Sequence, residues 1–113
     1  MSKTKIINCT PHPVTVVKRL LNGRYVVVAR FEASKNPVRL SMETVRRGWA
    51  GNVPLSHTVF GEPYNLPEQE QGVLLIVSQL VKNAIPWRRD LIVPAEVVRD
   101  ESGIIVGCQS FGL

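Results

Sequence analysis

Several features that would assign a protein to a class at once are missing from this chain of 113 residues. No apolar run approaches the ~18 residues that a membrane-spanning helix needs. The basic N-terminus is not followed by the apolar stretch of a secretion signal. We therefore expect a cytoplasmic protein without a membrane partner. Repeats and low-complexity tracts are also missing, and the length suits one hydrophobic core, so we expect a single domain over residues 1–113.

The common signatures of metal sites and of hydrolases are absent too. The two cysteines, Cys9 and Cys108, lie near opposite ends of the chain, and no CxxC or HxxxH spacing supplies further zinc ligands. In a cytosolic protein both are expected to be free thiols. No glycine-rich phosphate loop and no GxSxG elbow occurs. We expect no metal and no cofactor, and whether the protein is an enzyme stays open.

What the chain does have is positive charge. Fourteen lysines and arginines against nine acidic residues give a net charge of +5. Nine of the cations are arginines, which suit bidentate contacts to phosphate better than lysine does. The basic residues are scattered, with no basic tail and no helical stripe, so nucleic acid is not the expected partner. A bounded pocket for a small anion fits this pattern better.

Runs rich in β-branched residues dominate the sequence and predict strands. Residues 14–21 and 24–31 flank Asn22-Gly23, which predicts a hairpin closed by a type I′ turn with positive φ at both residues. A second hairpin is expected around the turn at 100–103. Further strands are expected at 5–7, 38–42, 53–60, 72–77 and 91–93, the last of them ended by Pro94.

One short helix is expected at residues 79–85, where Ser78 suits its N-cap and Pro86 stops it. The glycine-rich segment 46–52 predicts a turn or mobile loop, and 61–67 predicts an extended loop. Together these elements predict an α+β fold, mainly antiparallel β, with about six or seven strands and one short helix in a single compact domain.

The segment from Asn8 to Pro13 is the most distinctive part of the chain. His12 stands between two prolines and Thr10 likewise precedes one, which restricts four consecutive residues to few conformations. A histidine held in this way could act as an acid or base near neutral pH, or donate to a phosphate oxygen. Asn8 and Thr10 could hold that oxygen or orient the ring. The same residues could instead cap a structural turn, and the sequence leaves both interpretations open.

Two other polar residues could join that turn in a site. Ser78 lies where a strand passes into the helix, so free backbone N–H groups there could attract a phosphate, although a plain N-cap explains the residue as well. His57 lies on an expected strand and could form an acid–base pair with His12. No pattern in the sequence brings the two histidines together.

The segment Trp87-Arg88-Arg89-Asp90 combines an aromatic surface, two cations and a carboxylate. A nucleotide could stack on Trp87 while Arg88 or Arg89 contacts its phosphate and Asp90 bonds a ribose or base edge. The alternative is a surface loop with an Arg–Asp ion pair and a tryptophan packed into the core. The sequence favours neither.

Two further arginine-containing segments are weaker candidates. Trp49 with Arg46 and Arg47 forms a second aromatic and basic combination, on a flexible segment that could close over a ligand. Arg99 could contact an anion, but it precedes two acidic residues that are most simply explained by a polar hairpin turn.

Several segments together resemble an uncharacterised family of small proteins from phages, prophages and plasmids. The start Asn8-x-Thr10-Pro11-His12-Pro13 carries the resemblance, as does the ending Arg-Asp-Glu-x-Gly-Ile-Ile-x-Gly-Cys at 99–108. The intervening matches lie at 58–62, 66–67, 76–78 and 89–90. The resemblance covers nearly the whole chain, and other residue types stand at the position of His57 in the family.

The resemblance implies a phage or mobile-element protein acting in the cytoplasm of the infected bacterium, and such proteins often counter host defence. We therefore expect a homo-oligomer that binds and sequesters a small phosphate-bearing nucleotide immune signal, of the cyclic oligonucleotide or cyclic ADP-ribose type. Two alternatives stay open. One is a metal-independent phosphodiesterase with His12 as acid or base, assisted by Thr10, and the other is an inhibitor that binds a host protein.

Overall fold

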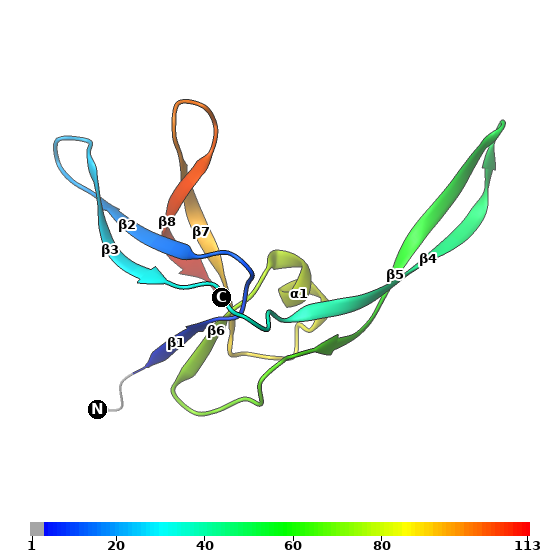
Figure 1. Cartoon of the computed structure of the whole chain (residues 1–113), viewed down its shortest axis with the longest axis horizontal. Coiled ribbons are helices and arrows are strands. Elements are labelled where there is room, and N and C mark those ends of the chain that lie inside the picture. Colours follow the sequence, from blue (N-terminus) through cyan, green and yellow to red (C-terminus); the bar gives the residue numbers. More distant parts are fainter. Residues whose placement is uncertain (1–3) are drawn as a thin grey trace.

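The computed structural model describes residues 4–113, which form eight strands and one short helix (Figure 1). The expected β-rich fold with one helix is confirmed, with slightly more strands than expected. The elements are β1 (Lys5–Asn8), β2 (Val14–Arg19), β3 (Tyr25–Phe31), β4 (Arg39–Ala50), β5 (Val53–Tyr64), β6 (Val73–Ile76), α1 (Gln79–Ala84), β7 (Leu91–Arg99) and β8 (Ile105–Gly112).

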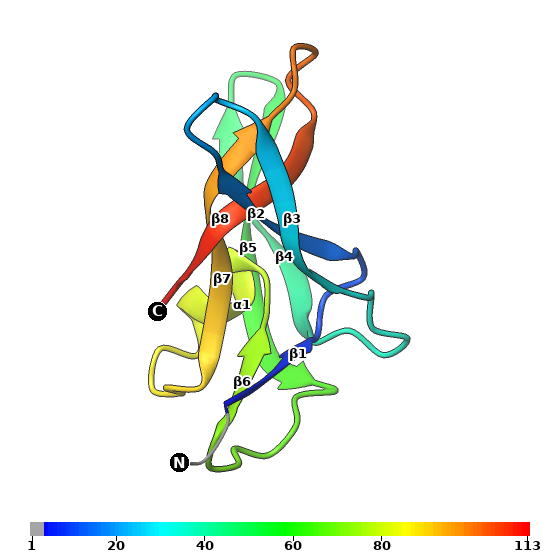
Figure 2. The same ribbon diagram turned by 90° about the vertical axis from the view of Figure 1, so that its left-hand side faces the viewer.

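Six of the strands form one mixed sheet in the order β1-β6-β7-β8-β2-β3 (Figure 2). β7 joins its two halves. The strand pairs in parallel with β6 at Leu91 and Ile92, and in antiparallel with β8 from Val93 to Arg99. The expectation that Pro94 ends this strand is wrong. From Val93 onward β7 has a partner on one side only, and such an edge position is where a sheet tolerates a residue without an N–H.

The core lies in the half of the molecule where α1 covers β6 and β7. The N-cap at Ser78 is confirmed, because its hydroxyl accepts a hydrogen bond from the N–H of Val81 at 3.2 Å. The helix ends at Ala84, one residue before the expected end. Val81 of the helix and Ile85 directly after it are buried in a cluster with Cys9, Val38, Leu40, Leu75, Val77, Leu91 and Val93.

The hairpin between β2 and β3 is present, but the expected type I′ turn is wrong. Gly23 has φ +85°, whereas Asn22 does not adopt a positive φ. The carbonyl of Leu20 accepts from the N–H of Gly23, and the N–H of Leu20 donates to Arg24, so a three-residue loop closes the hairpin. The β7–β8 hairpin repeats this arrangement, with φ +83° at Gly103.

β4 and β5 pair only with each other and stand away from the sheet as a long two-stranded arm (Figure 1). The expected loop at 46–52 is wrong, because β4 continues to Ala50 and only Gly51-Asn52 form the turn. The expected loop at 61–67 is wrong in its first part, because β5 continues to Tyr64. Because of the arm, the radius of gyration is 17.7 Å, against about 13 Å for a compact domain of this size.

We predict that Gly23→Ala lowers the free energy of unfolding by about 1 kcal/mol, since alanine pays a steric cost at positive φ. A Cβ there would meet nothing closer than an arginine side-chain atom at 4.0 Å, so the loss is conformational alone. Urea denaturation measures it. Asn22→Ala is the matched control and should cost less, because it removes only one exposed hydrogen bond, to the N–H of Arg24. Equal losses at both positions would instead indicate a type I′ turn.

Candidate functional site: a basic cavity beside the proline-rich turn

The turn after β1 is built around the side chain of Asn8, which is 7% exposed. Its Oδ1 accepts from the backbone N–H of Thr10 at 2.9 Å and lies 2.7 Å from the Thr10 hydroxyl. Its Nδ2 donates to the carbonyl oxygens of His12 at 2.8 Å and Phe31 at 3.2 Å. The amide therefore has no donor left for a ligand. Asn8 shapes the turn and ties it to the end of β3.

Backbone hydrogen bonds fasten the same turn to two other segments. The N–H of Cys9 donates to Ile76 in β6, and the carbonyls of Cys9 and Thr10 accept from Val38 and Ser34 in the loop before β4. His12 is exposed, and its imidazole makes no hydrogen bond within residues 4–113. The turn thus presents a free imidazole from a rigid backbone.

His12 lies at the rim of a cavity of about 720 Å³. The turn forms one wall, and the ends of β6 and β4 bring Val77, Ser78 and Arg39 to the cavity. The facing sheet wall is formed by β2, β7 and β8, with one residue from β3. The residues lining the cavity are Cys9, Thr10, Pro11, His12, Pro13, Val14, Thr15, Arg30, Val38, Arg39, Val77, Ser78, Pro94, Val97, Ile105, Val106, Gly107 and Cys108.

The cavity lining combines basic side chains and a few hydroxyl groups with a mostly apolar remainder. Arg30 and Arg39 join His12, and none of the described residues that line the cavity is an aspartate or glutamate. Arg30 pairs with Glu32 at 3.0 Å, but both side chains are largely exposed, so this ion pair is weak and exchangeable. Arg39 has no ion-pair or hydrogen-bond partner for its side chain among residues 4–113. The electrostatics favour an anion.

Three of the residues expected in a site do meet in this cavity: Thr10, His12 and Ser78. The Thr10 hydroxyl lies within hydrogen-bond distance of both Asn8 Oδ1 and the carbonyl of His12, so its single proton is engaged inside the turn. Ser78 uses an oxygen lone pair to cap α1, which leaves its hydroxyl proton for another acceptor.

Arg88 and Asp90 lie elsewhere and form a structural ion pair in which the carboxylate is buried. Arg88 Nε lies 2.8 Å from Asp90 Oδ1 and Nη2 lies 2.7 Å from Oδ2, a bidentate contact with the carboxylate only 4% exposed. Arg88 Nη2 also donates to the carbonyl of Pro67. The hydrogen bonds from Arg88 lower the pKa of Asp90. The two groups therefore bind each other, which agrees with the Arg–Asp ion pair of the alternative interpretation.

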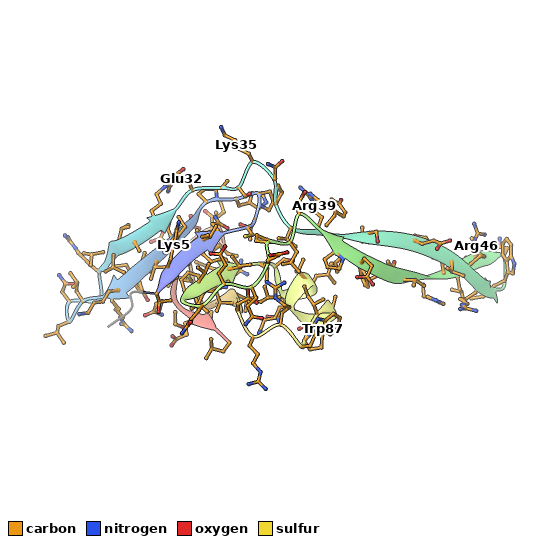
Figure 3. All side chains as sticks on the ribbon, turned by 90° about the horizontal axis from the view of Figure 1, so that it is seen from below. Lys5, Glu32, Lys35, Arg39, Arg46 and Trp87 are labelled. Carbon is orange, nitrogen blue, oxygen red and sulfur yellow. The ribbon has the colours of Figure 1, made fainter. Side chains whose placement is uncertain are left out.

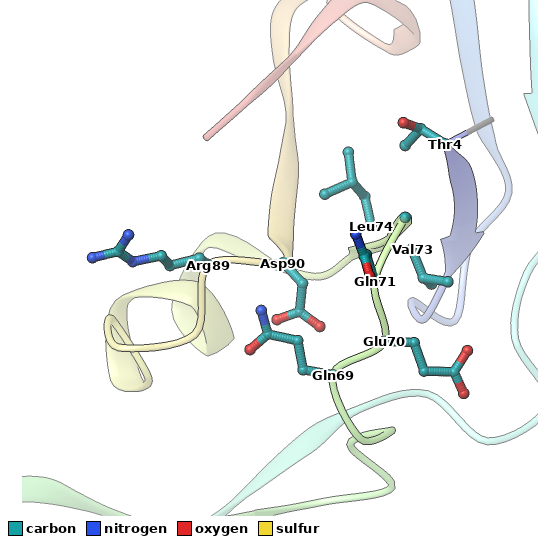
Figure 4. Close-up of a pocket in the computed structure, with 9 residues that line it drawn as sticks. Thr4, Gln69, Glu70, Gln71, Val73, Leu74, Arg89 and Asp90 are labelled. Atoms are coloured by element: carbon teal, nitrogen blue, oxygen red, sulfur yellow. The ribbon is translucent and has the colours of Figure 1, made fainter. Parts of the chain in front are cut away.

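The remaining expected residues also lie outside the cavity. Trp87 is 71% exposed beside α1 rather than packed in the core (Figure 3). Arg89 lines a smaller cavity of about 250 Å³ that Glu70 also lines, and its side chain extends away from it (Figure 4). Arg99 donates from Nη1 to the carbonyl of Gly103 at 2.8 Å and stiffens its own hairpin.

The second aromatic and basic combination belongs to the arm. The Arg46 guanidinium lies 5.8 Å from the centre of the Trp49 ring, so the two do make a cation–π contact, but on a strand instead of a loop. His57 lies on β5 and its Nδ1 accepts from Arg47 Nε at 3.0 Å. Neither segment lines the cavity that contains His12.

Sequence reasoning missed Arg30 and Arg39 as candidate site residues. Arg30 faces Thr15 across the β2–β3 ladder, and Arg39 begins β4 directly after the loop that the proline-rich turn fastens. No local motif marks either residue. The available signal was the register of the β2–β3 hairpin, which brings Arg30 next to the residues that follow Pro13.

Cys9 and Cys108, which lie near opposite ends of the chain, both line the cavity. Both are free and buried, and burial raises the pKa of both thiols, with a smaller contribution from Asp90 at Cys9. Within residues 4–113 no group of three or more His, Cys, Asp or Glu side chains could hold a metal ion. No helix in this part of the chain is long and apolar enough to cross a membrane.

Comparison of the chain with protein families, with curated proteins and with solved structures finds no match. The resemblance to small phage and plasmid proteins therefore stays a prediction. The functional argument has to come from the cavity itself.

We predict that the Arg88–Asp90 pair makes stability fall in acid. Because the pKa of Asp90 is lowered in the folded protein, its contribution is present above the ordinary aspartate pKa and is lost as the pH falls through the lowered value. Urea denaturation between pH 7 and pH 2 should show wild type more stable than Asp90→Asn near neutrality, with the difference shrinking in acid. A difference independent of pH would contradict this assignment.

Proposed function

We propose that this protein binds and sequesters a small phosphate-bearing nucleotide. The observation that carries the proposal is the charge of the cavity: two arginines and a histidine line it, and no described acidic residue does. Arginine forms bidentate contacts with phosphate, and the exposed His12 imidazole adds a further donor when protonated. A cationic rim over apolar walls suits a ligand that combines anionic groups with an apolar body.

The dimensions and walls of the cavity agree with a ligand of this class. Its volume of about 720 Å³ is within the range of small-molecule sites, roughly 300–1,000 Å³. Val97, Ile105 and Val106 offer aliphatic surface to a base or ribose. No described Phe, Tyr or Trp lines the cavity, so we propose aliphatic contacts to the base in place of the stacking on Trp87 that the sequence suggested.

The same residues favour capture over cleavage. Acid–base cleavage of a phosphodiester without a metal generally uses two proton-transfer groups, and the described lining of the cavity holds one histidine and no aspartate or glutamate. His57 contacts Arg47 on the arm, and the Thr10 proton is used within the turn. A phosphodiesterase with His12 as acid or base is therefore the second hypothesis for this site.

The predicted phage origin of the protein indicates which ligands should be tested first. Nucleotide immune signals, such as cyclic oligonucleotides and cyclic ADP-ribose derivatives, carry two or more phosphate charges on a compact body, which matches two arginines at one cavity. A protein-binding inhibitor is a third candidate function. It is favoured by β3, an edge strand of the sheet whose residues Val26, Val27 and Val28 are exposed.

We predict that the purified protein, mixed with cyclic dinucleotides and cyclic ADP-ribose isomers, retains one of them through gel filtration. Heat denaturation should then release the ligand unchanged, as chromatography of the supernatant will show. Conversion of the ligand that disappears in His12→Ala would replace capture by cleavage. If no nucleotide of the panel binds, the proposal fails and the protein-binding alternative takes its place.

We predict that Arg30→Gln and Arg39→Gln each weaken nucleotide binding about ten- to a hundredfold, because each removes a charged hydrogen bond to phosphate. Isothermal titration measures the dissociation constants. Arg89→Gln is the matched control, with the same change of charge outside the cavity, and should bind like wild type. If Arg89→Gln weakens binding more than Arg39→Gln does, the nucleotide binds in the smaller cavity instead.

A further inference from the structure

The arm formed by β4 and β5 exposes far more apolar surface than a two-stranded ribbon can carry alone. Each of its strands has 12 residues, and nearly every position is exposed. An isolated two-stranded hairpin is at best marginally stable in water. The large apolar side chains left exposed on the arm are Met42, Trp49, Val53, Leu55, Val59, Phe60 and Tyr64.

The strand register divides the middle of the arm into two faces. Glu43 lies opposite Val59 and Val45 lies opposite His57, so these four residues share one face. Arg47 belongs to it as well, since its Nε contacts His57. We call this the Glu43 face.

The opposite face contains Met42 with Phe60, Thr44 with Thr58, and Arg46 with Ser56. It carries the positive charge of Arg46, which lies over the Trp49 ring, and no acidic residue in these pairs. Two copies packed through this face would bring arginines into the contact without carboxylates to neutralise them. This face is therefore the poorer of the two for self-association.

We propose that the Glu43 face packs against the same face of a second copy of this chain, in a two-fold symmetric dimer. On one strand, Glu43 and Arg47 are each two residues from Val45. A two-fold axis through Val45 therefore sets Glu43 of each copy opposite Arg47 of the other, with the two Val45 side chains between them. The pattern is self-complementary in charge and apolar at its centre.

Two observations favour a second copy over an unrelated partner. Glu43 forms no ion pair and no hydrogen bond through its side chain within residues 4–113, although Arg47 lies on the same face. The arm, with three arginines and two glutamates, is also nearly neutral, while the whole chain carries +5. Self-association through the arm thus avoids most of the repulsion between two basic proteins.

Reversal of the two charges tests the pairing. Sedimentation velocity across a dilution series should show wild type at about twice the chain mass of 12.6 kDa. Glu43→Arg and Arg47→Glu should each weaken dimerisation about tenfold, because each places two pairs of like charges across the axis. The double reversal should restore the wild-type dissociation constant.

Arg46→Glu is the matched control, with the same charge change at the neighbouring position on the opposite face, and it should dimerise like wild type. Circular dichroism of each variant shows that the fold is retained. A monomeric wild type would mean that something other than a second copy covers the arm. That result, or a dimer that tolerates both single reversals, overturns the inference.

Disulfide trapping tests the position of the axis independently. Val45→Cys should cross-link two copies when the thiols are oxidised with diamide, since equivalent residues on a two-fold axis lie within disulfide range. Thr44→Cys, on the opposite face, should stay uncross-linked, and the native cysteines are buried. Equal cross-linking of both variants, or cross-linking of Thr44→Cys alone, overturns the proposed face.

Discussion

The buried amide of Asn8 is the interaction on which the rest of this structure depends. Its donors and its acceptor are all used within the protein, and they join the end of β1, the proline-rich turn and the last residue of β3. β1 and β3 are the two outer strands of the sheet, so this one side chain connects its edges. Because the turn is held in this way, the backbone around His12 is already ordered, so binding of the proposed ligand would not have to order it.

A small core leaves the outer parts of the molecule with exposed apolar side chains. The buried cluster lies where α1 covers β6 and β7, whereas the hairpin ends and the arm expose most of their apolar side chains. A β-ribbon must bury one face to be stable, and nothing else in the described chain covers these ribbons. The same openness creates the cavity, whose apolar wall is the uncovered surface of β7 and β8. The proposed ligand site and the proposed dimer face therefore lie on different parts of the surface that folding leaves exposed.

Local patterns predicted most elements and failed where neighbouring strands decide the outcome. The hairpins, the buried strand β6 and the helix capped by Ser78 follow from propensity and turn residues alone. Pro94 was expected to end a strand, but a strand paired on one side only can accommodate it. Gly48 was expected in a loop. It adopts φ +108° within a bulged region of β4, where a partner strand twelve residues long maintains the ladder.

The sequence by itself determined the rigid turn and the positive charge, because prolines restrict φ locally and charge depends on composition alone. The sequence could not show which arginines line the cavity. Arg88 stands beside a tryptophan and looked suited to phosphate, yet folding pairs it with the buried carboxylate of Asp90. Arg30 and Arg39 carry no local mark and reach the cavity through the β2–β3 register and the loop fastened by the turn. Contacts between residues distant in the chain place a side chain at a site, and only the tertiary structure holds that information.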